Sequence, residues 1–207
     1  MKIEEIETAW VRMPLKRAAG LSTGPIIHST DAVCRVTTAR GITGIGEGRG
    51  GPLHEICEII DQVFRPLLQG REAVNTQFLW DLMHDALMGE GAPAHHYARR
   101  TVLSAIAAVD LALWDIKAKA GGMPVGNLLG GRRRSIPAYI SDGVYIEGQS
   151  LSEMAEECVA ALEIGGCKKL KIRIGREPQD DAARVEAVRR AVGEGVELMA
   201  DVNEAWD

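Results

Sequence analysis

The segment Lys168-Lys169-Leu170-Lys171-Ile172-Arg173-Ile174-Gly175 alternates cationic with apolar side chains, and Leu198-Met199-Ala200-Asp201-Val202-Asn203 follows it. Such alternation predicts a β-strand. The residues between the two segments have a helical pattern, so we expect two parallel strands in one sheet. Parallel strands are normally apolar on both faces, whereas here one face is cationic and the second strand ends in a carboxylate and an amide. Because neighbouring strands lie about 4.8 Å apart, polar side chains are expected to converge at one end of the sheet: Lys171, Arg173, Asp201 and Asn203.

This polar cluster has a functional interpretation and a plain structural one. A buried ammonium group is costly unless it is paired or used, which favours a site. The alternative is a solvated strand face with an isolated aspartate at a strand end.

The composition is that of an ordinary globular protein, with 207 residues, 46% of them hydrophobic and 26% charged. This length allows one large domain or two smaller ones. The formal net charge of -5 argues against a nucleic-acid or membrane partner, and the basic run 132–134 is interpreted as a solvated turn. The 4 cysteines lack zinc-type spacing, and the N-terminus lacks an apolar signal sequence. We therefore expect a cytoplasmic protein with reduced thiols.

The first 130 residues predict an α+β domain. Strands are expected over about 1–14, 31–40 and 42–47, and helices over about 53–64, 74–88 and 97–120. In the last helix, apolar residues recur at spacings of 4, 3, 4 and 3 from Val102 to Ile116. Residues 16–30 lack periodicity and are expected to form a long loop. Strands followed by helices are typical of an α+β unit.

From residue 131 onwards the pattern alternates. We expect a strand over 136–140, a helix opened by the capping box Ser150–Glu153, the cationic strand, a helix over 180–192 and a strand over 196–203. A β-α-β-α-β order begins a parallel α/β barrel or a doubly wound sheet. So few units cannot close a barrel, and the last strand would have an unpaired edge. We therefore expect an N-terminal part of a longer protein, with domains at 1–130 and 131–207.

The whole sequence resembles the enolase superfamily, in its mandelate racemase/muconate lactonizing enzyme branch. The most specific stretches are Ala105–Ile116 (AIAAVDLALWDI), Pro124–Gly131 (PVGNLLGG) and the two strand ends described above. Residues 97–100 are a weaker signal for the mandelate racemase-like subgroup. The resemblance implies an α+β capping domain followed by a TIM-like, modified β/α barrel, here incomplete.

The resemblance also implies a chemistry, the abstraction of the proton α to a carboxylate to give an enediolate stabilised by Mg²⁺. It places Asp201 at the first of three metal carboxylates, with the other two expected beyond residue 207. Magnesium prefers such hard oxygen ligands. Asn203 matches a position that can hydrogen-bond the substrate, and Ser141 ends the first barrel-like strand, where a hydroxyl can face the substrate. A place in a turn is the alternative for both residues.

The family signature Lys-x-Lys, aligned on Ile174-Gly175, corresponds here to Lys171 and Arg173. The second lysine is usually the base, and arginine stays protonated in proteins. Either Lys171 takes the proton, or Arg173 acts electrostatically and the base lies beyond residue 207. The alternative register, with Lys169 as the first lysine, would misplace the following glycine.

We therefore predict a magnesium-dependent enzyme that acts on a small-molecule carboxylate and is a homo-oligomer when full length. Dehydration of an acid sugar or hydroxy acid is favoured, because loss of the second lysine weakens the two-base arrangement of a racemase. The alternatives are a racemase, epimerase or cycloisomerase of the same family, a truncated non-catalytic product, or an unrelated α/β binding protein. Residues 1–207 alone are expected to be inactive.

Overall fold

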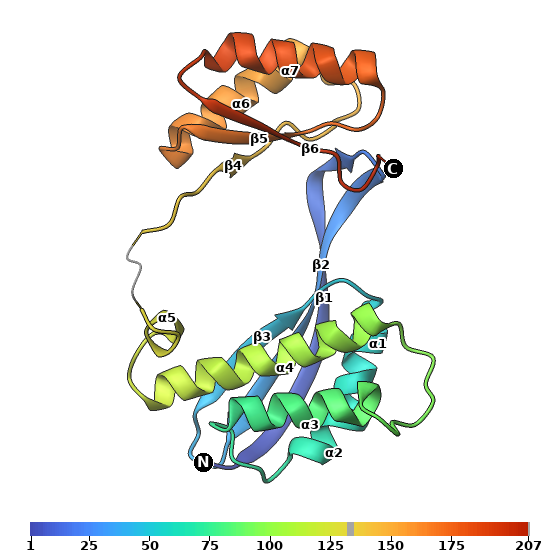
Figure 1. Ribbon diagram of the computed structural model, residues 1–207, viewed down its shortest axis with the longest axis vertical. Helices are drawn as coiled ribbons and strands as arrows, with labels where there is room; N and C mark the ends of the chain where they lie inside the picture. The colour runs from blue at the N-terminus through green and yellow to red at the C-terminus, as the bar shows by residue number, and fades with distance from the viewer. Residues whose placement is uncertain (132–134, 207) are drawn as a thin grey trace. The chain divides into compact units, whose positions relative to one another are not determined.

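The computed structural model describes residues 1–131 and 135–206, which form two compact units (Figure 1). The first unit contains Met1–Met13 and Thr30–Arg134, and the second contains Pro14–Ser29 and Ser135–Asp207. Residues 14–29 therefore belong with the second unit although they precede most of the first. The basic run 132–134, interpreted above as a turn, lies outside the described residues, and the domain boundary at 130/131 stays a prediction.

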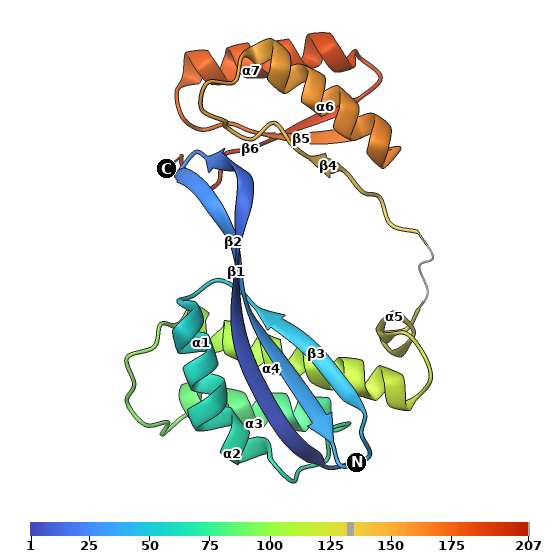
Figure 2. The same cartoon turned by 180° about the vertical axis from the view of Figure 1, so that it is seen from behind.

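A sheet in the order β1-β2-β3 is the framework of the first unit. Its strands are β1 (Ile3–Leu21), β2 (Gly24–Thr38) and β3 (Thr43–Gly48), and β2 pairs with β3 in antiparallel register. Six helical segments follow: α1 (Leu53–Ile59), the π-helical η1 (Ile60–Phe64), α2 (Arg65–Leu68), α3 (Thr76–Met88), α4 (Arg99–Ala120) and α5 (Val125–Leu128). Figure 2 shows the sheet in front of the helices from α1 to α4, which cover its other face. The predicted α+β class is confirmed.

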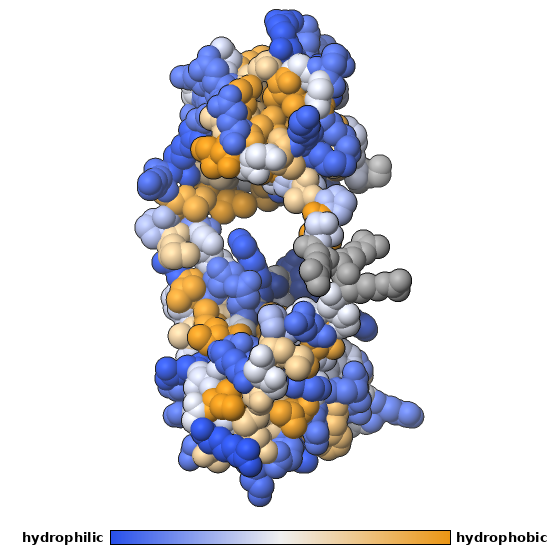
Figure 3. Space-filling model, turned by 90° about the vertical axis from the view of Figure 1, so that its left-hand side faces the viewer, coloured by the Kyte–Doolittle hydropathy of each residue, from blue (hydrophilic) through white to orange (hydrophobic). Residues whose placement is uncertain are grey.

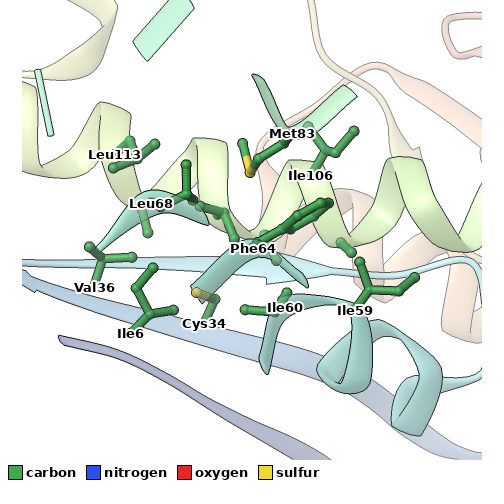
Figure 4. Close-up of a cluster of buried hydrophobic side chains, with 14 of the residues drawn as sticks. Ile6, Cys34, Val36, Ile59, Ile60, Phe64, Leu68, Met83, Ile106 and Leu113 are labelled. Carbon is green, nitrogen blue, oxygen red and sulfur yellow. The ribbon is translucent and has the colours of Figure 1, made fainter. Parts of the chain in front are cut away.

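The core of the first unit lies between the sheet and these helices (Figure 4). Alternate residues of β2, among them Cys34 and Val36, are fully buried, as a sheet with one covered face requires. They meet Phe64 of η1 and the apolar stripe of α4. Burial of such side chains contributes about 1.5–3 kcal/mol each, so this layer accounts for most of the unit's stability.

Glycine at alternate positions of β3 lets α4 approach the sheet closely. A Cβ atom on Gly46 would lie 2.1 Å from the carbonyl oxygen of Ala108, and one on Gly44 would lie 2.0 Å from that of Ala112. No side chain fits at such distances. The glycine-rich strand is therefore the surface on which the helix lies.

The prediction of a loop over residues 16–30 is wrong, because this segment is a β-hairpin. β1 continues to Leu21 and β2 begins at Gly24. Residues 16–18 are exposed, and from Ser22 to Thr30 every residue is exposed or only partly buried. Because neither face of this ribbon is covered by a core, its sequence has no apolar alternation to indicate strands.

The second unit contains a parallel sheet in the order β4-β5-β6. Its elements are β4 (Ile140–Ser141), α6 (Leu151–Gly165), β5 (Lys169–Arg173), α7 (Pro178–Val192) and β6 (Glu197–Asp201). The capping box is present, with Glu153 N donating to Ser150 Oγ at 3.2 Å. The strand predicted over 136–140 is only two residues long, because β4 starts at Ile140. The β-α-β-α-β order is confirmed.

Helices α6 and α7 lie on the same face of this sheet in both views (Figures 1 and 2). Leu170 and Ile172 of β5 point into that layer, where they pack with Met154, Cys158 and Val188. The alternate residues Lys169, Lys171 and Arg173 are only partly buried. One face of β5 thus holds the core and the other carries the cations.

Apolar and charged side chains are interspersed on the surface shown in Figure 3. The large apolar residues that stay exposed include Ile45, Leu129, Ile136 and Ile164. None of the helices within residues 1–131 and 135–206 combines the length and apolar character needed to cross a membrane.

Candidate functional site

The ends of β5 and β6 bring three of the predicted site residues together. Arg173 lies directly opposite Asp201 in the parallel register. Lys171 Nζ is 3.0 Å from Asp201 Oδ2, and the Arg173 guanidinium also donates to this oxygen. A single carboxylate oxygen therefore meets two cations.

Asp201 is held in its ionised form. Its Oδ1 atom accepts the backbone N–H of Asn203 at 2.9 Å. This hydrogen bond, followed by the bond from Lys171 and the nearby positive charges, lowers the pKa of Asp201. The side chain is 30% exposed, so the carboxylate is accessible from outside. An ionised carboxylate therefore faces the side chains of Lys171 and Arg173.

Asn203 lies in the turn that follows β6, with a φ of 49°. Asparagine is one of the few residues other than glycine that readily adopt a left-handed backbone, typically in turns. The side-chain Oδ1 atom is buried, and the described residues provide no hydrogen-bond partner for it. Both interpretations of Asn203 thus have support, since the residue is in a turn and also offers an unpaired acceptor.

Arg173 offers a hydrogen-bond donor, whereas Asn203 offers an acceptor. Its Nε atom is buried and has no partner among the described residues, although its NH1 atom pairs with Asp201. A buried polar atom without a partner costs about 1–3 kcal/mol. A donor on β5 and an acceptor just after β6 are therefore left for a ligand or for water.

Ser141 lies beside Lys171, because the two residues are partners in the β4–β5 pairing. Its side chain is exposed. Tyr139, which the sequence analysis missed, has its ring centroid 5.2 Å from Lys171 Nζ, within range of a cation–π interaction. Its position two residues before Ser141 was the available signal, since residues i and i+2 of a strand share a face.

Lys169 lies apart from this cluster. It pairs with Glu197 at 2.6 Å, at the beginning of both strands, whereas Lys171 and Arg173 meet Asp201 at their ends. The geometry therefore favours the register with Lys171 and Arg173 over the one that uses Lys169.

The tip of the hairpin 14–29 reaches the same strand ends. Ser22 Oγ donates to the carbonyl oxygen of Val202 at 2.5 Å, between Asp201 and Asn203. Gly20 pairs with Tyr145 in an antiparallel bridge. The hairpin thus borders the turn that carries Asn203.

A divalent metal finds one suitable ligand among these residues. Asp201 supplies the hard oxygen that magnesium prefers, and in residues 1–131 and 135–206 no three His, Cys, Asp or Glu side chains lie close enough to hold an ion. The Lys171 and Arg173 cations also compete for its Oδ2 atom. The described residues therefore supply one ligand for magnesium and not a complete set.

Residues 4–130 match the profile of the mandelate racemase/muconate lactonizing enzyme N-terminal domain. The chain belongs to this family. Residues 153–207 match the enolase C-terminal domain-like profile, so the resemblance deduced from the sequence is confirmed along most of the chain.

Characterised relatives catalyse different reactions. The chain is 31% identical over 173 residues to an arabinonate dehydratase from Saccharolobus solfataricus, covering 83% of this chain and 44% of that protein. It is 33% identical over 217 residues to a chloromuconate cycloisomerase from Cupriavidus necator, covering 100% of this chain and 54% of that protein.

Solved structures share the fold. An enolase superfamily member from Polaromonas sp. JS666 has a TM-score of 0.86 and 34% identity, covering 100% of this chain and 53% of that one. A dipeptide epimerase from Enterococcus faecalis, in complex with Mg and a dipeptide, has a TM-score of 0.84 and 27% identity, covering 100% and 55%. The chain spans about half the length of the relatives that it matches.

Proposed function

We propose that the complete gene product abstracts the proton α to a carboxylate with the assistance of magnesium, and that it dehydrates an acid sugar or a hydroxy acid. The main observation in support of this proposal is that Lys171, Arg173 and Asp201 lie together at the adjacent ends of two parallel strands. A family that includes dehydratases, cycloisomerases and racemases supports it. We also propose a cytoplasmic location and a homo-oligomeric state for the complete gene product.

The cations of β5 are proposed to bind and polarise the substrate. Lys171 is the candidate base or carboxylate-binding residue, and the guanidinium of Arg173 provides fixed positive charge because it does not lose its proton. The Nε atom of Arg173 and the Oδ1 atom of Asn203, which have no partner among the described residues, offer one hydrogen bond each to the substrate. Ser141, exposed beside Lys171, is a further proposed contact.

Asp201 is proposed as one magnesium ligand, with two further carboxylates contributed from beyond residue 207. When bound, magnesium would stabilise the negative charge that develops on the substrate carboxylate as the proton leaves. The epimerase solved with Mg supports this assignment by family likeness.

The second candidate is an isomerase, either a racemase or epimerase or a cycloisomerase. The match to the chloromuconate cycloisomerase covers the whole chain, whereas the match to the dehydratase covers 83% of it. A truncated product without catalytic activity is the remaining alternative.

The first test is exchange of the substrate α-proton with deuterium from heavy water, using the complete gene product and a panel of hydroxy acids, acid sugars and N-acyl amino acids. Lys171→Met is expected to lower the exchange rate by about 10²–10⁴-fold, the usual contribution of a general base. Lys169→Met, on the same strand but paired with Glu197, is the matched control and should retain the rate. Exchange that is absent from every acid, or equal loss in both variants, would contradict the proposal.

The same measurement separates the two candidate reactions. A dehydratase with Arg173 as an electrostatic residue should exchange the proton from one face only. Arg173→Lys keeps the charge and adds a group that can transfer a proton. Comparable exchange of both enantiomers by the wild type would make racemisation the correct assignment.

A further inference from the structure

A second network of charged and aromatic side chains surrounds Tyr145, between β4 and α6. The side chain is 8% exposed, and two guanidinium groups pack on its ring, with Cζ of Arg176 at 4.0 Å and Cζ of Arg184 at 4.1 Å from the centroid. The hydroxyl donates to Asp181 Oδ1 at 2.6 Å. Burial and this hydrogen bond raise the pKa of Tyr145 to about 12, so the phenol remains a donor at neutral pH.

One side of this network holds the hairpin 14–29. Gly20 N donates to the carbonyl oxygen of Tyr145 at 2.5 Å, and Tyr145 N donates to that of Gly20 at 3.0 Å. Arg176 donates to the carbonyl oxygen of Leu21 at 3.2 Å. A Cβ on Gly20 would lie 2.6 Å from both the Tyr145 oxygen and the Arg176 guanidinium, so only glycine permits this approach.

Another side of the network holds the end of β5. Arg184, itself 8% exposed, donates from Nε to the carbonyl oxygen of Arg173 at 3.3 Å and from NH2 to that of Gly143 at 2.5 Å. Asp181, which accepts the Tyr145 hydroxyl, also accepts the N–H of Gly175 at 2.6 Å through its other oxygen. The backbone on both sides of Ile174 is thereby fixed to groups that contact Tyr145.

We propose that Tyr145 is a positioning residue that couples the hairpin 14–29 to the strand end presenting Arg173. The ring joins the guanidinium that binds the hairpin to the one that binds β5, so the order of either segment depends on the other. Because Ser22 of the hairpin also binds the carbonyl of Val202, the turn with Asn203 is included in the coupling. The catalytic consequence rests on the proposed function, whereas the structural coupling does not.

Amide hydrogen exchange of the complete gene product tests the coupling without substrate or metal. Tyr145→Leu removes the ring contacts of both arginines, each a cation–π interaction of modest strength. Exchange is expected to become about tenfold faster in residues 16–24 and in residues 173–177 together. Tyr97→Leu, which removes a tyrosine from the first unit, is the control and should leave both segments unchanged. Acceleration confined to one segment, or to neither, would overturn the coupling.

Arg176→Met provides a second variant if Tyr145→Leu does not fold, because Arg176 is exposed. It removes the hydrogen bond to the carbonyl oxygen of Leu21 in the hairpin and is expected to accelerate exchange in residues 173–177 as well, through Tyr145. Unchanged exchange at 173–177 in this variant would overturn the proposal.

Kinetics test the catalytic consequence. For an acid that the wild type turns over, Arg176→Met should raise KM by about tenfold and change kcat by less than about threefold, with partial recovery in Arg176→Lys. A loss of kcat equal to the loss of folded protein would indicate a merely structural role and overturn this part. Absence of turnover by the wild type would instead contradict the proposed function, and the exchange experiment would still decide the coupling.

Discussion

Two cations meet one oxygen of Asp201, and this contact is the centre of the candidate site. The arrangement follows from strand geometry. Residues 171 and 173 share a face because side chains alternate along a strand, and Asp201 is the register partner of Arg173. Opposite charge at this point compensates for partial burial of all three groups.

Replacement of Asp201 is expected to remove a metal ligand and leave the fold intact. Asp201→Asn in the complete gene product keeps the size of the side chain but removes its charge, so the affinity for Mg²⁺ measured by calorimetry should fall by at least about tenfold. Glu197→Gln is the matched control, because Glu197 forms the corresponding ion pair with Lys169 at the other end of the strand. Equal magnesium affinity in the wild type and Asp201→Asn would remove Asp201 from the metal site.

The ion pairs of Asp201 should also make stability depend on pH. The pKa of this carboxyl lies below its ordinary value of 3.8 in the folded protein. A lowered pKa means that the stabilisation is fully present above the ordinary value and is lost as the pH falls through the lowered one. The difference in free energy of unfolding between wild type and Asp201→Asn, from urea titrations, should therefore be constant at neutral pH and shrink below about pH 4. A constant difference down to pH 2 would show that the pKa is not lowered.

Strand periodicity predicts that Lys171, Arg173 and Asp201 converge at one end of the sheet, and the structure places them in contact. Their catalytic and metal-binding roles follow from the family resemblance and stay predictions. The burial of Arg173 Nε and Asn203 Oδ1 without a partner among the described residues was not predictable, because burial of a single atom depends on packing across β4, β5 and β6. The position of Tyr139 was available from its spacing to Ser141, but its contact with Lys171 depends on its rotamer.

Strand β3 and helix α4 approach each other more closely than side chains allow. Gly46→Ala would place a methyl group 2.1 Å from the carbonyl oxygen of Ala108, and backbone must move to admit it. We expect a loss of about 1–3 kcal/mol in the free energy of unfolding, the usual cost of overpacking. Gly126→Ala is the control, since a Cβ there meets no atom within 4 Å. A loss below about 0.5 kcal/mol in the Gly46 variant would contradict this packing.

The elements differ in how clearly their sequences predict them. Helix α4 was predicted from its apolar stripe, and the buried residues of α4 follow that stripe. The hairpin 14–29 was missed because its contacts with the rest of the second unit are polar. They are made by the side chains of Arg17 and Ser22 and by the backbone of Gly20 and Leu21, and such contacts leave no trace in apolar periodicity.

The two units have separate apolar cores, and none of the buried residues that the structure describes belongs to both. The first core is the larger of the two. We therefore expect residues 1–207 to unfold in two steps, with the smaller core exposed first. Hydrogen exchange in increasing urea should show it, with Leu170→Ala lowering only the stability of the second unit and Leu113→Ala only that of the first. Each substitution should cost about 2–5 kcal/mol. A single cooperative transition shifted by both variants would contradict separate cores.

The placement of residues 14–29 with the second unit limits how members of this family can exchange parts by recombination. A single crossover near residue 130 would join the hairpin of one parent to the Tyr145 and Arg176 of another. The glycine at position 20 tolerates no added atom against that partner. A chimera is therefore compatible only when both parents share these residues, or when a second exchange transfers 14–29 along with the barrel segment. Lineages that swap their capping domains should show matched changes on both sides of this contact.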